Sequence, residues 1–214
     1  MVSPTALCLV RHGETTWNAE RRLQGHLDIP LNDQGDAQAR ATAKALARHR
    51  FAAIYASDLA RARQTAQAAS QTLSLAVITD SRLRERHYGF FQGLTYDEAQ
   101  ARHPQAYARF VARDADFVFP GGGESLAGFA ERIRCTLQEI AARHPGEQVL
   151  VVTHGGVLDI ARRLATGKPF DAARDFAIPN AALNWLEIGG DRWRLVSWAD
   201  QSHLHHTRDE LSNA

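Results

Sequence analysis

The sequence predicts an α/β fold: a single-domain three-layer sandwich whose mostly parallel sheet has an antiparallel edge strand and helices on both faces. Two short apolar runs, Leu7–Val10 and Val149–Thr153, each lead to a histidine and a glycine, which is typical of buried strands that open into loops at the carboxyl edge of a sheet. Stretches with helical spacing separate these runs. Two extended segments around the turn Gly189-Gly190-Asp191 have the pattern of a hairpin and supply the antiparallel edge.

Composition limits the kind of protein. With 214 residues, 44% of them hydrophobic, the chain fits one domain over residues 1–214. Its 25 basic and 24 acidic residues give a net charge of +1 and are spread along the chain, which argues against nucleic-acid or membrane partners and for a small ligand. Residues 1–10 do not resemble a secretory signal, and no apolar stretch approaches the ~20 residues of a membrane span. We therefore expect a soluble cytoplasmic protein.

The first half of the chain alternates helix and strand. After an irregular polar segment, Asn32 caps a helix over about 34–49, and a strand over 53–56 follows. Ser57 or Asp58 then caps a helix that carries Arg61 in its first turn and runs to about 75. A short strand over 76–79 leads into the run 83–94, which is rich in polar, aromatic and glycine residues and is typical of a loop that lines a site.

The second half contains the clearest strand. A helix over 95–103 is broken by Pro104, and residues 106–112 form another turn or two. The glycines at 121–123 form a flexible loop before a helix that Ser125 caps and that runs to about 144. The strand over 149–153 is followed by a helix over 157–165 and by hairpin strands over 180–187 and 193–198. Cys8 and Cys135 predict buried small side chains rather than a disulfide framework.

Several charged residues fall at predicted strand or helix ends. Arg11 offers a planar fork suited to phosphate or carboxylate, and the imidazole of His12 can serve as base, acid, nucleophile or metal ligand. Arg61 lies at a helix N-terminus, where free amides favour an oxyanion. Taken singly, such residues are as often solvated charges or satisfied core histidines. The tail histidines, His203, His205 and His206, lack matched carboxylates or cysteines, so no metal site is predicted.

Longer motifs favour a functional interpretation. Residues 11–18, RHGETTWN, residues 57–66 with the pattern S-D-L-x-R-A-x-Q-T-A, the loop around Glu85 and the strand that ends at His154 follow one another in order. Together they resemble the histidine phosphatase superfamily, which includes the cofactor-dependent phosphoglycerate mutases and many phosphomonoesterases. The segments of this resemblance run from Leu7 to Gly155 and cover most of the chain.

The resemblance implies metal-independent phosphoryl transfer through a phosphohistidine. In this scheme His12 is the nucleophile, kept neutral because its other ring nitrogen donates to a backbone carbonyl. Arg11, Arg61 and a cationic His154 stabilise the transferring group, and Glu85, on a mobile-looking loop, acts as general acid and then as general base. The resemblance and the position of the loops suggest six substrate-binding residues: Asn18, Gln24, Gly25, Arg86, Tyr88 and Gly155.

Three functions remain open at this stage. Tyr96 stands where the mutases have a lysine, and the region from Arg113 to Phe119 lacks their long insertion with paired arginines, so a bisphosphorylated intermediate would be held weakly. This favours a phosphatase without cofactor; a phosphoglycerate mutase, which would need 2,3-bisphosphoglycerate, is the alternative. A non-catalytic phospho-ligand-binding module is the third, although the chain keeps all five candidate catalytic residues. The physiological phosphoester and a homodimer are left undecided.

Overall fold

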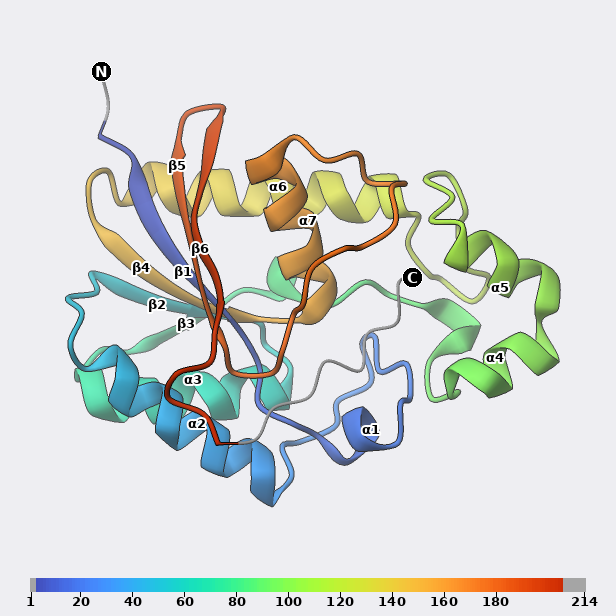
Figure 1. Ribbon diagram of the computed structural model, residues 1–214, viewed down its shortest axis with the longest axis horizontal. Helices are drawn as coiled ribbons and strands as arrows, with labels where there is room; N and C mark the ends of the chain where they lie inside the picture. The colour runs from blue at the N-terminus through green and yellow to red at the C-terminus, as the bar shows by residue number, and fades with distance from the viewer. Residues whose placement is uncertain (1–2, 206–214) are drawn as a thin grey trace.

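The computed structural model describes residues 3–205. They contain one six-stranded sheet in the order β3-β2-β4-β1-β5-β6 (Figure 1). The strands are β1 (Thr5–Arg11), β2 (Ala53–Ala56), β3 (Val77–Thr79), β4 (Gln148–Thr153), β5 (Leu183–Gly189) and β6 (Arg192–Asp200). The first four pair in parallel, whereas β5 is antiparallel to β1 and β6 to β5. The predicted α/β class and antiparallel edge are confirmed.

Two pairs of helices cover the two faces of this sheet, as Figure 1 shows. Leu7 and Leu9 of β1 pack with α6 (Leu126–Arg143) and α7 (Gly155–Thr166) in one buried cluster. Cys8 and Val10 point to the other face and pack with α2 (Asp33–Leu46) and α3 (Ala60–Leu73). Because successive side chains of a strand point to opposite faces, one apolar run supplies both cores. The result is the predicted three-layer sandwich.

A smaller group of helices lies to one side of the sheet (Figure 1). It comprises α4 (Tyr96–Arg102) and α5 (Pro104–Val111), which share an aromatic cluster with Phe91 and Phe119. The short helix α1 (Thr16–Ala19) and the 3-10 turns η1 (Ser81–Leu83) and η2 (Gly89–Phe91) complete the described elements. These segments come from the polar, irregular parts of the sequence, and they surround the carboxyl edge of the sheet.

Some expectations of local structure are confirmed and others are wrong. Asn32 and Ser125 cap their helices as predicted. Neither Ser57 nor Asp58 caps α3, because Leu59 occupies the N-cap position, one or two residues later. Asp28 caps the helix from another loop by accepting a 2.6 Å hydrogen bond from the Ala60 amide. Two smaller corrections concern Pro104 and Cys135. The proline starts α5 instead of only ending α4, and the cysteine is partly exposed.

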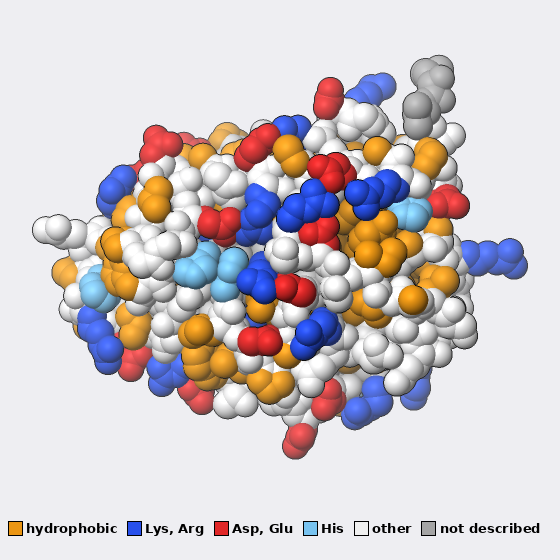
Figure 2. Space-filling model, turned by 180° about the vertical axis from the view of Figure 1, so that it is seen from behind, with side chains coloured by type: hydrophobic (Ala, Val, Ile, Leu, Met, Phe, Trp, Pro, Cys, Tyr) orange, Lys and Arg blue, Asp and Glu red, His pale blue; other side chains and the backbone are white. Residues whose placement is uncertain are grey.

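On the face of the molecule that is turned away from the viewer in Figure 1, positive and negative side chains are mixed. Figure 2 shows acidic and basic side chains interspersed over that face, with histidines gathered beside them. Among the described residues, Arg84 forms an ion pair with Asp58 at 2.6 Å and Arg82 with Asp80 at 2.8 Å. In the described part of the chain, no helix combines the length and the apolar character that crossing a bilayer requires.

Candidate active site

The pairing of β1 with β4 brings two histidines together. Arg11 lies opposite Thr153 in this parallel register, so the next residue of each strand, His12 or His154, emerges at the same edge. The amide of His12 still donates to the Thr153 carbonyl, at 2.9 Å. The two imidazole rings meet edge to face with 5.2 Å between their centroids. Their proximity is therefore fixed by the backbone ladder of the sheet.

The surroundings of His12 select one neutral tautomer. Its Nδ1 lies 2.7 Å from the carbonyl oxygen of Gly13, so Nδ1 carries the proton and donates it, which leaves the lone pair on Nε2. Burial lowers the pKa of His12 well below its usual value, and the nearby charges of Arg61 and Arg11 lower it further. The ring is therefore neutral at pH 7. The backbone-carbonyl partner expected from the sequence is present.

His154 differs from its expected charge state. Its Nε2 and the hydroxyl of Ser57 are joined by a 2.8 Å hydrogen bond, whereas its Nδ1 has no such partner within the described chain. Burial lowers the pKa of His154 well below the usual value, and the charges of Arg61, His12 and Arg11 act in the same direction. In the absence of a bound phosphate the ring is therefore neutral, because it is fully enclosed and faces positive charge, and its expected positive charge beside a transferring phosphoryl group stays a prediction.

Two buried arginines flank the histidines. Arg11 donates from Nη1 to the Ile178 carbonyl at 2.9 Å. Arg61 donates to the carbonyls of Gly25 and Leu27, both at 2.8 Å, and burial lowers its pKa to about 10. Both guanidinium groups reach a pocket of about 380 Å³. Its walls are formed by Arg11, His12, Asn18, Arg22, Leu23, Gln24, Gly25, Arg61, Glu85, Tyr88 and Tyr96.

The predicted ligands Asn18 and Gln24 also hold the loop together. Asn18 accepts a 2.9 Å hydrogen bond from the Thr15 amide, which closes the capping box of α1, and Gln24 donates to the Thr15 hydroxyl at 2.9 Å. Gly25 has a φ of +52°, and a Cβ there would lie 2.2 Å from the Gln92 side chain. The positive φ and the close Gln92 side chain therefore favour glycine at this position.

Glu85 is buried at the edge of the same pocket. Its carboxylate accepts hydrogen bonds from the amides of Arg86, at 2.8 Å, and Gly156, at 3.0 Å. Burial raises its pKa, and this effect outweighs the opposing hydrogen bonds and the charges of Arg61 and Arg11. The sequence singled out Gly155, yet Gly156 is the glycine in contact with Glu85, where a Cβ would lie 2.2 Å from Oε1.

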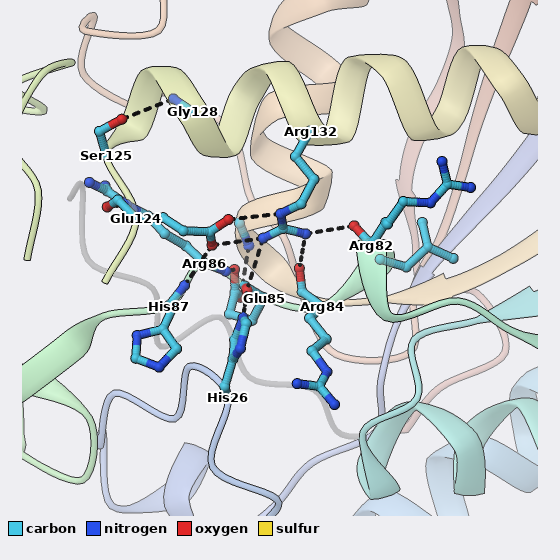
Figure 3. Close-up of polar contacts among 12 residues, drawn as sticks. His26, Arg82, Arg84, Glu85, Arg86, His87, Glu124, Ser125, Gly128 and Arg132 are labelled. Atoms are coloured by element: carbon cyan, nitrogen blue, oxygen red, sulfur yellow. Dashed lines mark hydrogen bonds and ion pairs between the residues drawn. The ribbon is translucent and has the colours of Figure 1, made fainter. Parts of the chain in front are cut away.

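The loop that carries Glu85 is held in place by several hydrogen bonds, whereas its sequence suggested a mobile loop. Figure 3 shows Arg132 reaching down from α6 into this loop. Its guanidinium donates to the carbonyls of Arg82, Arg84 and Glu85, at 2.6, 3.1 and 3.3 Å. The same group forms a two-point ion pair with Glu124, at 2.7 and 2.8 Å. One side chain therefore holds three backbone carbonyls of the segment that ends at Glu85.

His26 connects the loop of Glu85 to the loop that lies over the end of the first strand. The Nε2 of His26 donates to the Glu85 carbonyl at 2.8 Å, so this oxygen accepts from two sides (Figure 3). The His26 ring also meets the ring of His87 at 4.7 Å, and the His87 amide donates to Glu124 at 2.9 Å. The segments around Gly25 and Glu85 are therefore joined directly.

A second pocket of about 540 Å³ adjoins the first and shares the walls formed by Tyr88 and Tyr96. It contains the predicted ligands Arg86, Tyr88 and Gly155. Two further buried arginines, Arg113 and Arg174, also line it. The fold thus brings arginines from distant segments into one pocket, which the sequence did not indicate; the weaker retention of a bisphosphorylated intermediate than in the mutases stays a prediction.

Comparison with known proteins decides the family. The sequence profile of the histidine phosphatase superfamily (branch 1) matches residues 7–201. The chain belongs to this superfamily. Its curated relatives in Arabidopsis thaliana include a phosphoglycerate mutase-like protein 4, 45% identical over 94% of this chain and 87% of the relative, and a metal-independent phosphoserine phosphatase, 42% identical over 94% and 83%.

Solved structures agree with this assignment. YhfR from Bacillus stearothermophilus superimposes with a TM-score of 0.85 at 35% identity, covering 93% of this chain and 98% of the other. A mycobacterial glucosyl-3-phosphoglycerate phosphatase does so with a TM-score of 0.79 at 34% identity, covering 91% and 99%. The mostly parallel sheet with histidines at two neighbouring strand tips is therefore the fold of a histidine phosphatase.

Neither His203 nor His205 lines the two pockets of this histidine phosphatase. His203 contacts the Ala181 carbonyl and the Thr42 hydroxyl, at 3.1 and 3.0 Å, whereas His205 is exposed. His206 lies outside the described residues. Within residues 3–205, no three His, Cys, Asp or Glu side chains are grouped so that they could hold a metal ion.

Proposed function

We propose that this histidine phosphatase is a metal-independent phosphomonoesterase that hydrolyses small phosphorylated metabolites, with His12 as the phosphorylated nucleophile. One observation carries the proposal: a neutral imidazole with its lone pair on Nε2 shares a single pocket with Arg11, Arg61 and the raised-pKa carboxyl of Glu85. These are the parts that phosphoryl transfer needs, namely a nucleophile, fixed positive charge and a proton donor. No metal or cofactor takes part in the proposed reaction.

The first half-reaction forms the phosphoenzyme. His12 Nε2 attacks phosphorus while the bond to the alcohol oxygen breaks, and protonated Glu85 gives its proton to that oxygen. Arg11 and Arg61 stabilise the charge that spreads over the equatorial oxygens. A bound phosphate dianion would raise the pKa of His154, since an opposite charge favours the charged imidazole. His154 would then add a positive charge only when substrate is present.

The second half-reaction restores the enzyme. Glu85, now a carboxylate, takes a proton from water, whose oxygen attacks phosphorus as the bond to His12 breaks. Inorganic phosphate leaves, and Glu85 is again protonated for the next cycle. The carboxylate is held for this task by the amides of Arg86 and Gly156, which keep its oxygens near the pocket in both states.

The named relatives support hydrolysis of small phosphorylated molecules, since they include a phosphoserine phosphatase and a glucosyl-3-phosphoglycerate phosphatase. A phosphoglycerate mutase, with 2,3-bisphosphoglycerate as cofactor, remains the second candidate, because Arg113 and Arg174 add cations that could hold an acid. We place the enzyme in the cytoplasm. Its free cysteines, Cys8 and Cys135, are compatible with a reducing compartment.

The two enzymatic candidates differ in their product. When 3-phosphoglycerate is followed by phosphorus NMR in the presence of 2,3-bisphosphoglycerate, we expect inorganic phosphate as the main product and little 2-phosphoglycerate. The physical reason is that Tyr96, a neutral side chain, lines both pockets where a lysine would retain the bisphosphorylated intermediate. Rapid isomerisation with almost no phosphate would show that the enzyme is a mutase. Phosphate binding without turnover of any phosphomonoester would indicate a binding module.

Arg132 offers a test of the clamp on the proposed acid. Replacing it by alanine removes every hydrogen bond that Figure 3 shows from α6 to the loop of Glu85, so the backbone that positions the carboxyl is held less firmly. We expect kcat for alkyl phosphates to fall roughly 10-fold or more, with a smaller loss for p-nitrophenyl phosphate. Arg134→Ala, on the same helix but ion-paired to Glu131 at the surface, is the control and should behave as wild type. Equal losses for both substrates would contradict the positioning role.

A further inference from the structure

The proton on Nδ1 of His12 depends on a single peptide group. In the proposed reaction the ring attacks through Nε2, which has a lone pair only while Nδ1 holds the proton. Nδ1 lies 2.7 Å from the carbonyl oxygen of Gly13 and donates to it. This oxygen belongs to the peptide group that joins Gly13 to Glu14. A contact that fixes or polarises this peptide group therefore acts on the reactive ring.

Gln38 holds the other end of the same peptide group. The amide of Glu14 donates to Oε1 of Gln38 at 2.8 Å. Gln38 lies on α2 and is only 2% exposed. A series of two hydrogen bonds therefore runs from the ring of His12 through the Gly13–Glu14 peptide group to a buried side chain of a different element.

The two hydrogen bonds of this series strengthen each other. When Gln38 accepts from the Glu14 amide, electron density shifts toward the Gly13 carbonyl oxygen, which becomes a better acceptor for the ring proton. Burial increases this effect, because little water competes for either group. The contact with Gln38 therefore favours the tautomer that leaves the lone pair on Nε2.

The preceding peptide group is also held by buried side chains. The His12 carbonyl accepts from Nδ2 of Asn180 at 2.9 Å, and the Gly13 amide donates to Oγ1 of Thr65 at 3.0 Å. Asn180 and Thr65 are both buried. The backbone at the tip of β1 is therefore fixed up to the peptide group that the ring itself contacts.

A close approach of α2 to the strand tip makes the contact of Gln38 possible. A Cβ on Gly35 would lie 2.0 Å from the Glu14 carbonyl oxygen, and a Cβ on Gly13 would lie 2.5 Å from the Gly35 carbonyl oxygen. Glycine at both positions lets the first turn of α2 lie directly against the strand tip. Gln38 follows about one turn later on the helix and reaches the Glu14 amide.

We propose that Gln38 is a positioning residue for the nucleophile, which holds His12 in its Nδ1–H tautomer through the Gly13–Glu14 peptide group. This inference rests on the proposed function and adds to it a residue outside the pocket. Within residues 3–205, Gln38 is not among the side chains that line either pocket, so it acts through the ring of His12.

Nitrogen NMR of the ring tests the inference directly. The protein is labelled with nitrogen-15 histidine, and the ring resonances of His12 are identified because His12→Ala removes them. At pH 7 we expect the wild-type ring to show the Nδ1–H tautomer alone. Gln38→Met has a side chain of similar length without the oxygen acceptor. In this variant we expect a mixture of the two tautomers.

Steady-state kinetics gives a second readout on the same variant. In Gln38→Met we expect kcat/KM to fall roughly 3- to 10-fold, the scale of one buried hydrogen bond. The loss should be equal for an alkyl phosphate and p-nitrophenyl phosphate, because the nucleophile is affected and the leaving group is not. A smaller loss for p-nitrophenyl phosphate would overturn the inference, since it would place the effect on the proton donor.

Gln64→Met is the matched control. Gln64 lies on α3 and accepts from the Leu31 amide at 2.9 Å, so this variant loses the same kind of contact at the surface. The resonances of His12 and both kcat/KM values should stay as in the wild type. Thermal unfolding of each variant checks that the fold is intact.

Gln38→Glu keeps an oxygen acceptor and decides the matter even where Gln38→Met does not fold. It should retain the single tautomer, and its Nδ1 proton resonance should move downfield, because a carboxylate accepts more strongly than an amide. A wild-type resonance in Gln38→Glu, or wild-type ring shifts in a folded Gln38→Met, would overturn the inference. Failure of the wild-type protein to hydrolyse any phosphomonoester would instead overturn the proposed function and leave the NMR result standing.

Discussion

Replacement of His12 by alanine is expected to abolish turnover and phosphoenzyme together. In the proposed reaction every phosphoryl group passes through Nε2 of this ring, and its tautomer is set by the 2.7 Å contact with the Gly13 carbonyl. His154 cannot take its place, because its Nε2 is engaged by Ser57. The measurement uses labelled substrate, rapid quenching in alkali, in which phosphohistidine is stable, and counting of protein-bound label beside released phosphate.

The control for this experiment is His205→Ala, which removes an exposed histidine outside the pocket and should leave both signals unchanged. It also tests the absence of a functional metal site in the C-terminal segment. Acid-labile phosphate that persists on the His12→Ala protein would mean that another residue is the nucleophile. Turnover that requires added magnesium would mean that the proposed metal-independent chemistry is wrong.

The second large effect is expected for Glu85→Gln. The amide cannot donate a proton to an alkoxide, so kcat should fall roughly 10²-fold or more for alkyl phosphates, the usual scale of positioned proton transfer. Substrate binding should change little, since glutamine can still accept from the amides of Arg86 and Gly156. p-Nitrophenyl phosphate should lose much less, because its leaving oxygen needs little protonation. Equal losses for both substrates would place the acid elsewhere.

The pH profile gives an independent check of this role. The pKa of Glu85 is raised by burial, so the acid form persists to a higher pH than an exposed glutamate allows. Turnover of alkyl phosphates should therefore fall as the pH rises through that raised pKa. The acidic limit of activity depends on His12, which must be neutral to act as nucleophile. Because its pKa is lowered, the ring stays neutral as the pH falls, and activity should extend to acidic pH. In Glu85→Gln the decrease at high pH should disappear.

The fold was predictable because its signals are local. Apolar runs such as Leu7–Val10 and Val149–Thr153 identified central strands, and caps such as Asn32 identified helix starts. The exceptions depend on contacts between distant segments. The start of α3 is fixed by Asp28 from another loop, and no pattern within residues 57–66 could have revealed that partner.

Four of the five catalytic candidates line one pocket, and their catalytic roles stay predictions; the contacts around them could not be predicted from the sequence. His12 and Glu85 occur in motifs that the sequence displays directly. Arg132 lies within an ordinary amphipathic helix, and Arg113 follows a short helix far along the chain, so neither carries a signal of its own. The neutral state of His154 before substrate binds could not be predicted, because burial among other cations is a property of the assembled fold.

The position of β1 in the sheet has a consequence for how the protein is made. This first strand is central, between β4, which begins at residue 148, and β5, which ends at residue 189. On a ribosome that adds about 5–20 residues per second, β1 leaves the exit tunnel on the order of 10 s or more before its partners exist. Its apolar face is exposed during that time. Chaperone supply and translation speed should therefore affect the yield of active enzyme.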